Sequence, residues 1–234
     1  MELGLPPTIS ACLFDLDGVL TQTAKVHAQA WKQTFDEFLP SQAGQAPFDL
    51  VSDYDQYVDG KPREDGVRSF LESRRIANDE NLVHYLASLK DATFLDLIHA
   101  HGVERYDGSM HYLDAVRHAG IKTAVVSSSK NTTEVLQAAG ISGFDAQVDG
   151  NIAEDEHLHG KPAPDTYLQA ARMLDLDATR CAVFEDALAG VEAGRAGRFG
   201  RVVGVDRAGQ KDALLRHGAD VVVEDLEELL GRTA

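Results

Sequence analysis

The second half of the chain alternates short apolar runs with stretches that carry apolar residues at helical spacing. Strand-like runs occupy residues 122–127, 181–185, 201–205 and 220–223, with one more near the N-terminus at 10–16. Helical patterns lie at 109–119, 131–139 and 163–174. Strands that alternate with helices in this way indicate βαβ units, so we expect an α/β fold with a parallel sheet and helices on both faces.

The region between the first two strand-like runs interrupts this alternation. Helical patterns follow one another at 24–39, 63–74 and 79–101 with no clear strand, and 40–47 has the composition of a loop. The apolar face of the first pattern is built at i, i+4, i+7 and i+8 by Trp31, Phe35, Phe38 and Leu39. We therefore expect a core domain of residues 1–22 and 107–234, with an all-helical cap domain of residues 23–106 inserted into it.

The balance of charges narrows the range of partners. The 234 residues include 22 Lys and Arg against 38 Asp and Glu, a formal net charge of −16. Such a surface repels nucleic acid and anionic membranes, so we expect neither as a partner. Positive groups around an anionic substrate must then be placed locally.

The remaining composition is that of an ordinary globular protein. Cys12 and Cys181 each lie beside an apolar run and are interpreted as small buried hydrophobes, with no metal-type spacing. The first ten residues lack a basic segment followed by an apolar one, and no apolar run approaches the roughly 18 residues of a membrane span. We expect a cytoplasmic protein.

Two carboxylates, Asp15 and Asp17, follow the first expected strand, with Gly18 after them. Taken alone, they would simply begin a turn. In extended backbone, however, side chains two residues apart share a face, so both would point into one site. The functional interpretation is a nucleophile at Asp15 and a proton-handling partner at Asp17.

A serine-rich segment follows the second strand-like run along the chain. It consists of Ser127, Ser128, Ser129, Lys130 and Asn131. Serines before a helix are often N-caps. The alternative is that Ser127 and the amides at the helix start hold phosphate oxygens, which the positive end of a helix favours.

Two further charged groups occupy corresponding positions. Lys161 lies in the segment GKPAPD, where two prolines stiffen a loop; a lysine here is either merely solvated or a fixed ammonium for phosphate. Glu185 and Asp186 end a strand-like run and suit a hard cation such as Mg²⁺, which favours one or two carboxylates plus phosphate and water. Because ligands bind outside the carboxyl ends of parallel strands, the four groups together favour one site over four unrelated turns.

These segments resemble the four motifs of the haloacid dehalogenase superfamily. The resemblance rests on DLDGVL from Asp15, VVS ending at Ser127, GKPAPD around Lys161, and Glu185 with Asp186. It implies a Rossmann-like core, a Mg²⁺ cofactor and an aspartyl-phosphate intermediate. It implies the following roles: Asp15 as nucleophile and metal ligand, Asp17 as general acid/base whose backbone carbonyl also binds the metal, Glu185 and Asp186 at the metal, and Ser127 and Lys161 on the phosphoryl group.

A closer resemblance is to the β-phosphoglucomutases, in subfamily IA. The string DLDGVLTQTAKVHAQAW places Thr23, His27 and Trp31 where that group has its hinge threonine, cap histidine and cap tryptophan. The segment GKPRED from Gly60 is similar to its cap loop, in which an arginine, here Arg63, grips the non-transferring phosphate. SSSKN resembles its SASKN segment. The resemblance therefore implies substrate contacts from His27, Trp31, Gly60, Arg63, Lys90, Ser127, Ser128, Ser129, Lys130, Asn131 and Lys161.

Some of these cap residues also have plainer interpretations. Trp31 and His27 share a face with Phe35, so packing alone would explain them. Arg63 near a helix start would be solvated, although cations are mildly disfavoured at that end. The segment 48–57 departs from the known members and is expected to alter the sugar pocket, and Asp107 stands where many relatives have Pro.

The resemblance implies interconversion of β-glucose 1-phosphate and glucose 6-phosphate through β-glucose 1,6-bisphosphate. A sugar-phosphate phosphatase would use the same core residues and differs in letting water attack the phosphoaspartate. A mutase must exclude water through a closing cap, a role implied for Thr23, His27 and Arg63. A catalytically inactive binding protein is the third alternative, disfavoured because all core groups are present. We expect a monomer that binds small sugar phosphates.

Overall fold

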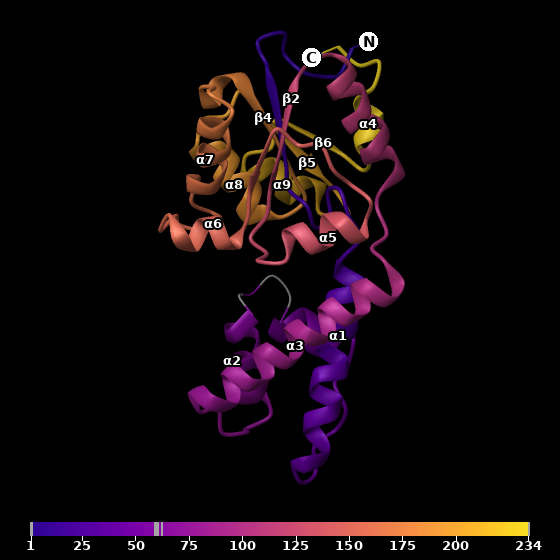
Figure 1. Cartoon of the computed structure of the whole chain (residues 1–234), viewed down its shortest axis with the longest axis vertical. Helices are drawn as coiled ribbons and strands as arrows, with labels where there is room; N and C mark the ends of the chain where they lie inside the picture. The colour runs from indigo at the N-terminus through magenta and orange to yellow at the C-terminus, as the bar shows by residue number, and fades with distance from the viewer. Residues whose placement is uncertain (1, 59–60, 62, 234) are drawn as a thin grey trace. The chain divides into compact units, whose positions relative to one another are not determined.

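The computed structural model describes residues 2–58, 61 and 63–233, apart from the side chain of Asp55. Contacts between residues divide the chain into two compact units, Met1–Gln22 with Glu104–Ala234, and Thr23–Val103. The chain therefore re-enters the first unit at Glu104, three residues before the boundary expected from the sequence. Both termini of the first unit lie together (Figure 1), where Gly4 N–H donates to the carbonyl of Arg232 over 2.9 Å.

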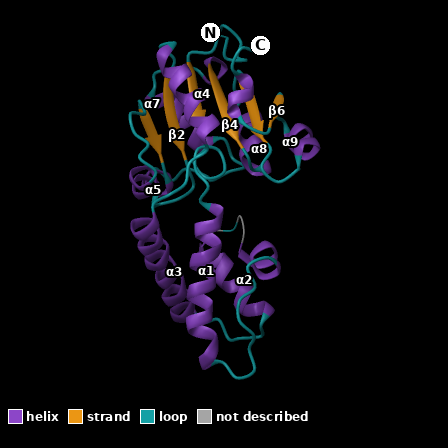
Figure 2. Cartoon of the chain, turned by 90° about the vertical axis from the view of Figure 1, so that its right-hand side faces the viewer, coloured by secondary structure: helices purple, strands orange, loops and turns teal. Residues whose placement is uncertain are grey.

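The first unit is built on a six-stranded parallel sheet in the order β3-β2-β1-β4-β5-β6. The strands are β1 (Ala11–Phe14), β2 (Lys122–Val126), β3 (Ala146–Val148), β4 (Cys181–Glu185), β5 (Arg201–Val205) and β6 (Val221–Val223). β1 lies between β2 and β4, so the residues that follow these three strands meet at one edge (Figure 2). The α/β fold with a parallel sheet is confirmed.

Helices cover both faces of this sheet because its strands are apolar on both sides. The helices of this unit are α4 (Asp107–His118), α5 (Thr132–Ala138), α6 (Gly150–Asp155), α7 (Asp165–Met173), α8 (Leu188–Ala196) and α9 (Lys211–His217). α7, α8 and α9 pack on one face, over side chains such as Leu13, Val126 and Val183. On the other face, Phe14 stacks on Phe184 with ring centroids 4.6 Å apart, and Tyr112 of α4 lies 5.4 Å from Phe184. Cys12 and Cys181 are buried free thiols, as expected.

The sequence pattern missed two short elements of this unit, β3 and α6. β3 has three residues and α6 has six, too few to establish a period of two or of 3.6 residues. β6 is as short as β3 but consists of three consecutive valines, which made it recognisable as a strand. α6 instead begins with a capping signal, since the Asp149 carboxylate accepts hydrogen bonds from the amides of Asn151 and Ile152 over 3.0 Å each.

The second unit is helical in its described residues. It contains α1 (Ala24–Phe38), a 3₁₀ turn (Leu39–Ser41), a π-helical turn (Tyr54–Val58), α2 (Arg63–Ser73) and α3 (Glu80–His101). The 3₁₀ turn takes in Pro40 and Ser41, so the loop expected at 40–47 starts later than predicted. Phe35 of α1 lies at the centre of the core of this unit, with ring centroids 4.0 Å from Phe70 and 5.3 Å from Phe48.

The divergent segment 48–57 contributes to this core. Phe48 is buried, and Asp53, 7% exposed, accepts hydrogen bonds from the amide of Asp49 and from Arg74 of the segment after α2, over 2.9 and 2.5 Å. The segment therefore stabilises the helical unit from within. In the described part of the chain, no helix combines the length and the apolar character needed to cross a membrane.

We expect Phe35→Ala to destabilise the helical unit by about 3–5 kcal/mol, because it removes a fully buried ring and leaves a cavity among three aromatic neighbours. Urea unfolding followed by circular dichroism would measure this loss. Val51→Ala is the control, since Val51 is 69% exposed and its truncation should change stability by about 0.5 kcal/mol or less. Equal unfolding midpoints for the two variants would contradict the prediction.

Candidate active site

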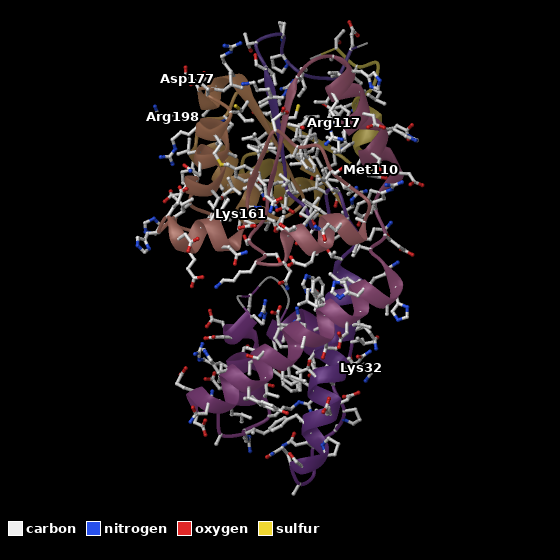
Figure 3. The ribbon with its side chains drawn as sticks, viewed as in Figure 1. Lys32, Met110, Arg117, Lys161, Asp177 and Arg198 are labelled. Carbon is white, nitrogen blue, oxygen red and sulfur yellow. The ribbon has the colours of Figure 1, made fainter. Side chains whose placement is uncertain are left out.

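The centre of the site is a buried ammonium between two carboxylates. Lys161 Nζ lies 2.5 Å from Asp15 Oδ1 and 2.5 Å from Glu185 Oε1. Asp15 follows β1, Glu185 ends β4, and the Lys161 ammonium also lies 3.5 Å from the carbonyl of Val126, the last residue of β2. Figure 3 shows Lys161 at the carboxyl end of the sheet. Three strand ends that are distant in sequence are thus joined by one side chain.

The Glu185 carboxylate is 1% exposed and held by further groups. The Tyr167 hydroxyl donates to its Oε1 over 2.8 Å, and the amide of Ala187 donates to its Oε2 over 3.3 Å. A Cβ on Gly190 would lie 1.8 Å from Oε1, so only glycine leaves room for this carboxylate under α8.

A second glycine makes room for Asp186. Gly18 has a φ of 84°, and a Cβ there would lie 1.9 Å from Asp186 Oδ2. The loop after Asp17 therefore approaches the next carboxylate closely only because residue 18 lacks a side chain. The carbonyl of Asp186 accepts a hydrogen bond from Gln210 Nε2 over 3.1 Å, which fixes the backbone at this point.

The carboxylates of the site repel one another, and this repulsion adds to the effect of burial on their pKa values. Burial raises the pKa of Asp15 well above its ordinary range, and the charges of Glu185, Asp186 and Asp17 add to this, while Lys161 opposes it. Burial and Glu185 likewise raise the pKa of Asp186 to about 7. Burial alone would lower the pKa of Lys161, yet the carboxylates of Asp15 and Glu185 outweigh it and raise that pKa. One ammonium does not balance this much negative charge.

The donor set fits a divalent hard cation. Asp15, Glu185 and Asp186 each offer a carboxylate oxygen, and these oxygens lie within 4.8 Å of one another. Carboxylate oxygens are the ligands that Mg²⁺ takes in proteins, together with phosphate and water. A bound cation would offset the mutual repulsion that raises the pKa values of Asp15 and Asp186.

The serine-rich segment after β2 is fixed by local hydrogen bonds. Ser127 is 2% exposed, and its Oγ accepts a hydrogen bond from the amide of Ser129 over 3.1 Å. Ser129 Oγ accepts from the amide of Asn131 over 3.1 Å. The predicted phosphate-holding Ser127 thus follows β2 directly, beside Val126, whose carbonyl lies near Lys161. Lys130 instead pairs with Glu154 at 2.5 Å, and Ser128 is exposed.

Arg207 holds the loop that carries Asp17, a role that no sequence pattern indicated. Its Nε donates to the carbonyl of Gly18 over 2.9 Å, its Nη1 donates to the carbonyl of Glu224 over 2.7 Å, and its guanidinium lies 3.5 Å from the ring centroid of Tyr106. Arg207 follows β5, so a fourth strand end supports the same loop.

The family model described as haloacid dehalogenase-like hydrolase matches residues 9–198. The chain belongs to the haloacid dehalogenase-like hydrolase family. The resemblance stated from the four motifs is therefore confirmed.

Within this hydrolase family, the chain is similar to both mutases and phosphatases, to different degrees. The chain is 50% identical to a β-phosphoglucomutase of Mycobacterium tuberculosis over 246 aligned positions, which cover 97% of this chain and 94% of that protein. It is 26% identical to a phosphorylated carbohydrates phosphatase of Thermotoga maritima, with 95% of this chain and 97% of that protein covered. The crystal structure of a Clostridium difficile β-phosphoglucomutase matches with a TM-score of 0.77 at 27% identity, covering 95% of this chain and 94% of the other. The mutase is thus much closer in sequence than this phosphatase.

The helical unit of this family member brings two of its predicted residues together. His27 Nδ1 lies 2.8 Å from Lys90 Nζ, and the His27 ring stacks on Phe94 with centroids 4.3 Å apart. Because an ammonium can only donate, Nδ1 accepts and the imidazole is neutral with its proton on Nε2. Burial lowers the pKa of His27 well below its usual value, and the charges of Lys90 and Arg63 lower it further.

The other predicted cap residues have more varied surroundings. Trp31 is 4% exposed and stacks on Phe35, which favours the core-packing interpretation, although Lys90 Nζ lies 5.4 Å from its ring centroid. Arg63 begins α2 and forms an ion pair with Asp91 at 2.6 Å, so it is not merely solvated. Thr23 is buried before α1, and its carbonyl accepts from the amide of His27. Gly60 lies outside the described residues.

Sequence reasoning missed the residues that hold the charged groups in place. These are Tyr167, Gly190, Arg207 and Gln210. Gly190 lies four residues, about one helical turn, after Asp186, so its spacing from that motif was a usable signal. Tyr167 lies six residues after Lys161 and has no such spacing. No comparable spacing marks Arg207 or Gln210, which depend on the return of the chain after β5.

We expect Gly190→Ala to lower turnover by about 100-fold, because the added methyl group displaces Glu185 and with it Lys161. The fold should survive, since alanine favours a helix over glycine by roughly 1 kcal/mol. Steady-state kinetics and circular dichroism would test this. Gly160→Ala is the matched control, because a Cβ there meets nothing within 4 Å. Full turnover in Gly190→Ala would show that Glu185 needs no such space.

The neutral state of His27 predicts a pH dependence of stability. The pKa of His27 is lowered in the folded chain. The neutral imidazole therefore contributes fully to the free energy of unfolding above the ordinary pKa of about 6.5, and this contribution is lost as the pH falls below that value. We expect the wild type to lose about 1 kcal/mol more than His27→Gln between pH 7.5 and pH 5, since glutamine can still accept from Lys90 without binding a proton. Urea titrations at both pH values measure the difference; parallel losses would refute it.

Proposed function

We propose that this chain is a Mg²⁺-dependent β-phosphoglucomutase that forms a phosphoaspartate at Asp15. The observation that carries the proposal is the ammonium of Lys161 shared by Asp15 and Glu185 at the strand ends, in a chain 50% identical to a β-phosphoglucomutase over 97% of its length. The same core geometry suits a sugar-phosphate phosphatase, and the 26% identity to a phosphorylated carbohydrates phosphatase makes that the weaker alternative.

The first half-reaction moves a phosphoryl group onto the protein. A carboxylate oxygen of Asp15 forms a bond to phosphorus while the bond from phosphorus to an oxygen of β-glucose 1,6-bisphosphate breaks, and Asp17 gives its proton to that leaving oxygen, which releases a glucose monophosphate. Lys161 would balance the charge on Asp15 and on the phosphoryl oxygens, and Ser127 would donate a hydrogen bond to one of them. Asp15, Glu185, Asp186 and the carbonyl of Asp17 would hold Mg²⁺, which when bound neutralises phosphoryl charge.

The second half-reaction transfers the phosphoryl group from Asp15 to the free hydroxyl of a glucose monophosphate, which regenerates the bisphosphate. Asp17, now a carboxylate, takes the proton of that hydroxyl, whose oxygen attacks phosphorus as the bond to Asp15 breaks. Water must be kept out during this exchange. The helical domain predicted from the sequence spans residues 23–106. Within it, we assign the substrate contacts to His27, Arg63 and Lys90. Thr23 would be the hinge residue that links substrate binding to the alignment of Asp17. These assignments rest on the resemblance, and the ion pair of Arg63 with Asp91 must open for Arg63 to grip a phosphate. A monomeric state and a cytoplasmic location remain predictions.

The test is a product analysis. Purified protein with β-glucose 1-phosphate, Mg²⁺ and a trace of β-glucose 1,6-bisphosphate should yield glucose 6-phosphate, measured with a coupled dehydrogenase, and little inorganic phosphate. Release of phosphate as the main product would establish the phosphatase instead.

The Asp15→Asn variant should lose turnover by at least about 10⁴-fold while staying folded, because the amide is no nucleophile. Asp17→Asn should slow the reaction by about 10²–10⁴-fold, the usual contribution of a general acid and base. Undiminished turnover of Asp15→Asn would overturn the proposal that Asp15 is the residue phosphorylated during catalysis.

A further inference from the structure

Tyr167 lies beside the charged cluster, and the mechanism above does not use it. The residue is fully buried on α7, and its hydroxyl donates to Glu185 Oε1 over 2.8 Å. The Lys161 ammonium lies 5.0 Å from the centroid of the Tyr167 ring. One tyrosine therefore contacts both partners of the central ion pair, through its hydroxyl and through its ring face.

The hydrogen bonds of Glu185 are distributed unevenly between its two oxygens. Oε1 is bonded to both the Tyr167 hydroxyl and the Lys161 ammonium, at 2.8 and 2.5 Å. Among the bonds found in the described residues, Oε2 receives a long one of 3.3 Å from the amide of Ala187. A carboxylate held this way cannot rotate without breaking the two shorter bonds. Oε2 is then the oxygen with capacity left for a cation.

Packing of α7 on the sheet holds the Tyr167 side chain in place. α7 packs on β1, β2 and β3 next to Phe199, whose ring lies 6.0 Å from that of Tyr167 in an edge-on contact. The Glu185 carboxylate lies directly against Gly190, where a Cβ would be 1.8 Å from Oε1. The carboxylate is thus held by a buried donor and packed against a glycine.

We propose that Tyr167 is a positioning residue for the divalent cation: by occupying Glu185 Oε1 together with Lys161, it turns Oε2 toward the metal and keeps the ammonium on Asp15. This inference rests on the proposed Mg²⁺ dependence. Groups that orient metal ligands typically contribute about 10–100-fold to metal affinity or activity, which sets the size of the expected effect.

Tyr112 provides a matched control in the same domain. It is also fully buried, and its hydroxyl makes a hydrogen bond of 2.9 Å, to the carbonyl of Leu3. Its ring packs against Phe14 and Phe184 on the other face of the sheet. Tyr112→Phe and Tyr167→Phe each remove one buried hydroxyl. Only Tyr167→Phe also removes a hydrogen bond to a carboxylate of the site.

The experiment titrates Mg²⁺ into the metal-free protein by isothermal calorimetry and measures thermal unfolding without metal. We expect Tyr167→Phe to bind Mg²⁺ about tenfold more weakly and Tyr112→Phe to bind it within twofold of wild type. In kinetics, the Mg²⁺ concentration for half-maximal rate should rise for Tyr167→Phe, with most of the rate restored at saturating Mg²⁺. In a Glu185→Gln background, adding Tyr167→Phe should change Mg²⁺ affinity by less than twofold, because the tyrosine acts through that carboxylate.

The outcomes separate this inference from the proposed function. Wild-type affinity in Tyr167→Phe, with normal Mg²⁺ binding by the wild type, would overturn the inference alone. Equal weakening in both tyrosine variants would reduce Tyr167 to a structural role and overturn it as well. Failure of the wild type to bind or require Mg²⁺ would overturn both the metal dependence and the role of Tyr167 in it.

Discussion

The architecture of the first domain depends on one ammonium group buried between two carboxylates. Removing a charged side chain from water is costly, and the attraction inside the protein offsets this only when geometry and further hydrogen bonds are favourable. Lys161 meets these conditions through Asp15, Glu185 and the carbonyl of Val126. Each belongs to a different strand end, so the ion pairs can form only when β1, β2 and β4 are in register. The order of the strands therefore makes this arrangement of charges possible.

Two glycines make the same arrangement sterically possible. At Gly18 and Gly190 a single methyl group would overlap a carboxylate oxygen, of Asp186 in one case and Glu185 in the other. Gly18 also needs its positive φ for the turn after Asp17. The resulting site concentrates negative charge that Lys161 alone does not balance, and this charge adds to burial, the larger cause, in raising the pKa values of Asp15 and Asp186.

The sequence predicted those parts of the molecule that repeat a pattern or form a motif. The strands from Cys181 and Arg201 and the helix from Ala24 were predicted at or within one residue of their observed bounds, because apolar runs and a 3.6-residue period span their full length. β3 and α6 are too short for any period to appear. Of the site, the charged groups at the strand ends were predicted and come together, whereas Tyr167 and Arg207 were not, since their roles arise from packing between elements far apart in the sequence.

In the helical unit, the surroundings of His27 include contacts that the motif resemblance did not indicate. The resemblance implied two separate substrate contacts for His27 and Lys90. In the structure the two side chains contact each other, and the ammonium keeps the imidazole neutral. Phe94 stacks on that imidazole and faces the same ammonium at 4.8 Å, so an aromatic side chain that no motif marked fixes both groups. A neutral imidazole with its proton on Nε2 presents a donor, and a donor is what a sugar hydroxyl or phosphate oxygen can accept. The packing of α1 against α3 thus determines the chemical character of His27 before any substrate arrives.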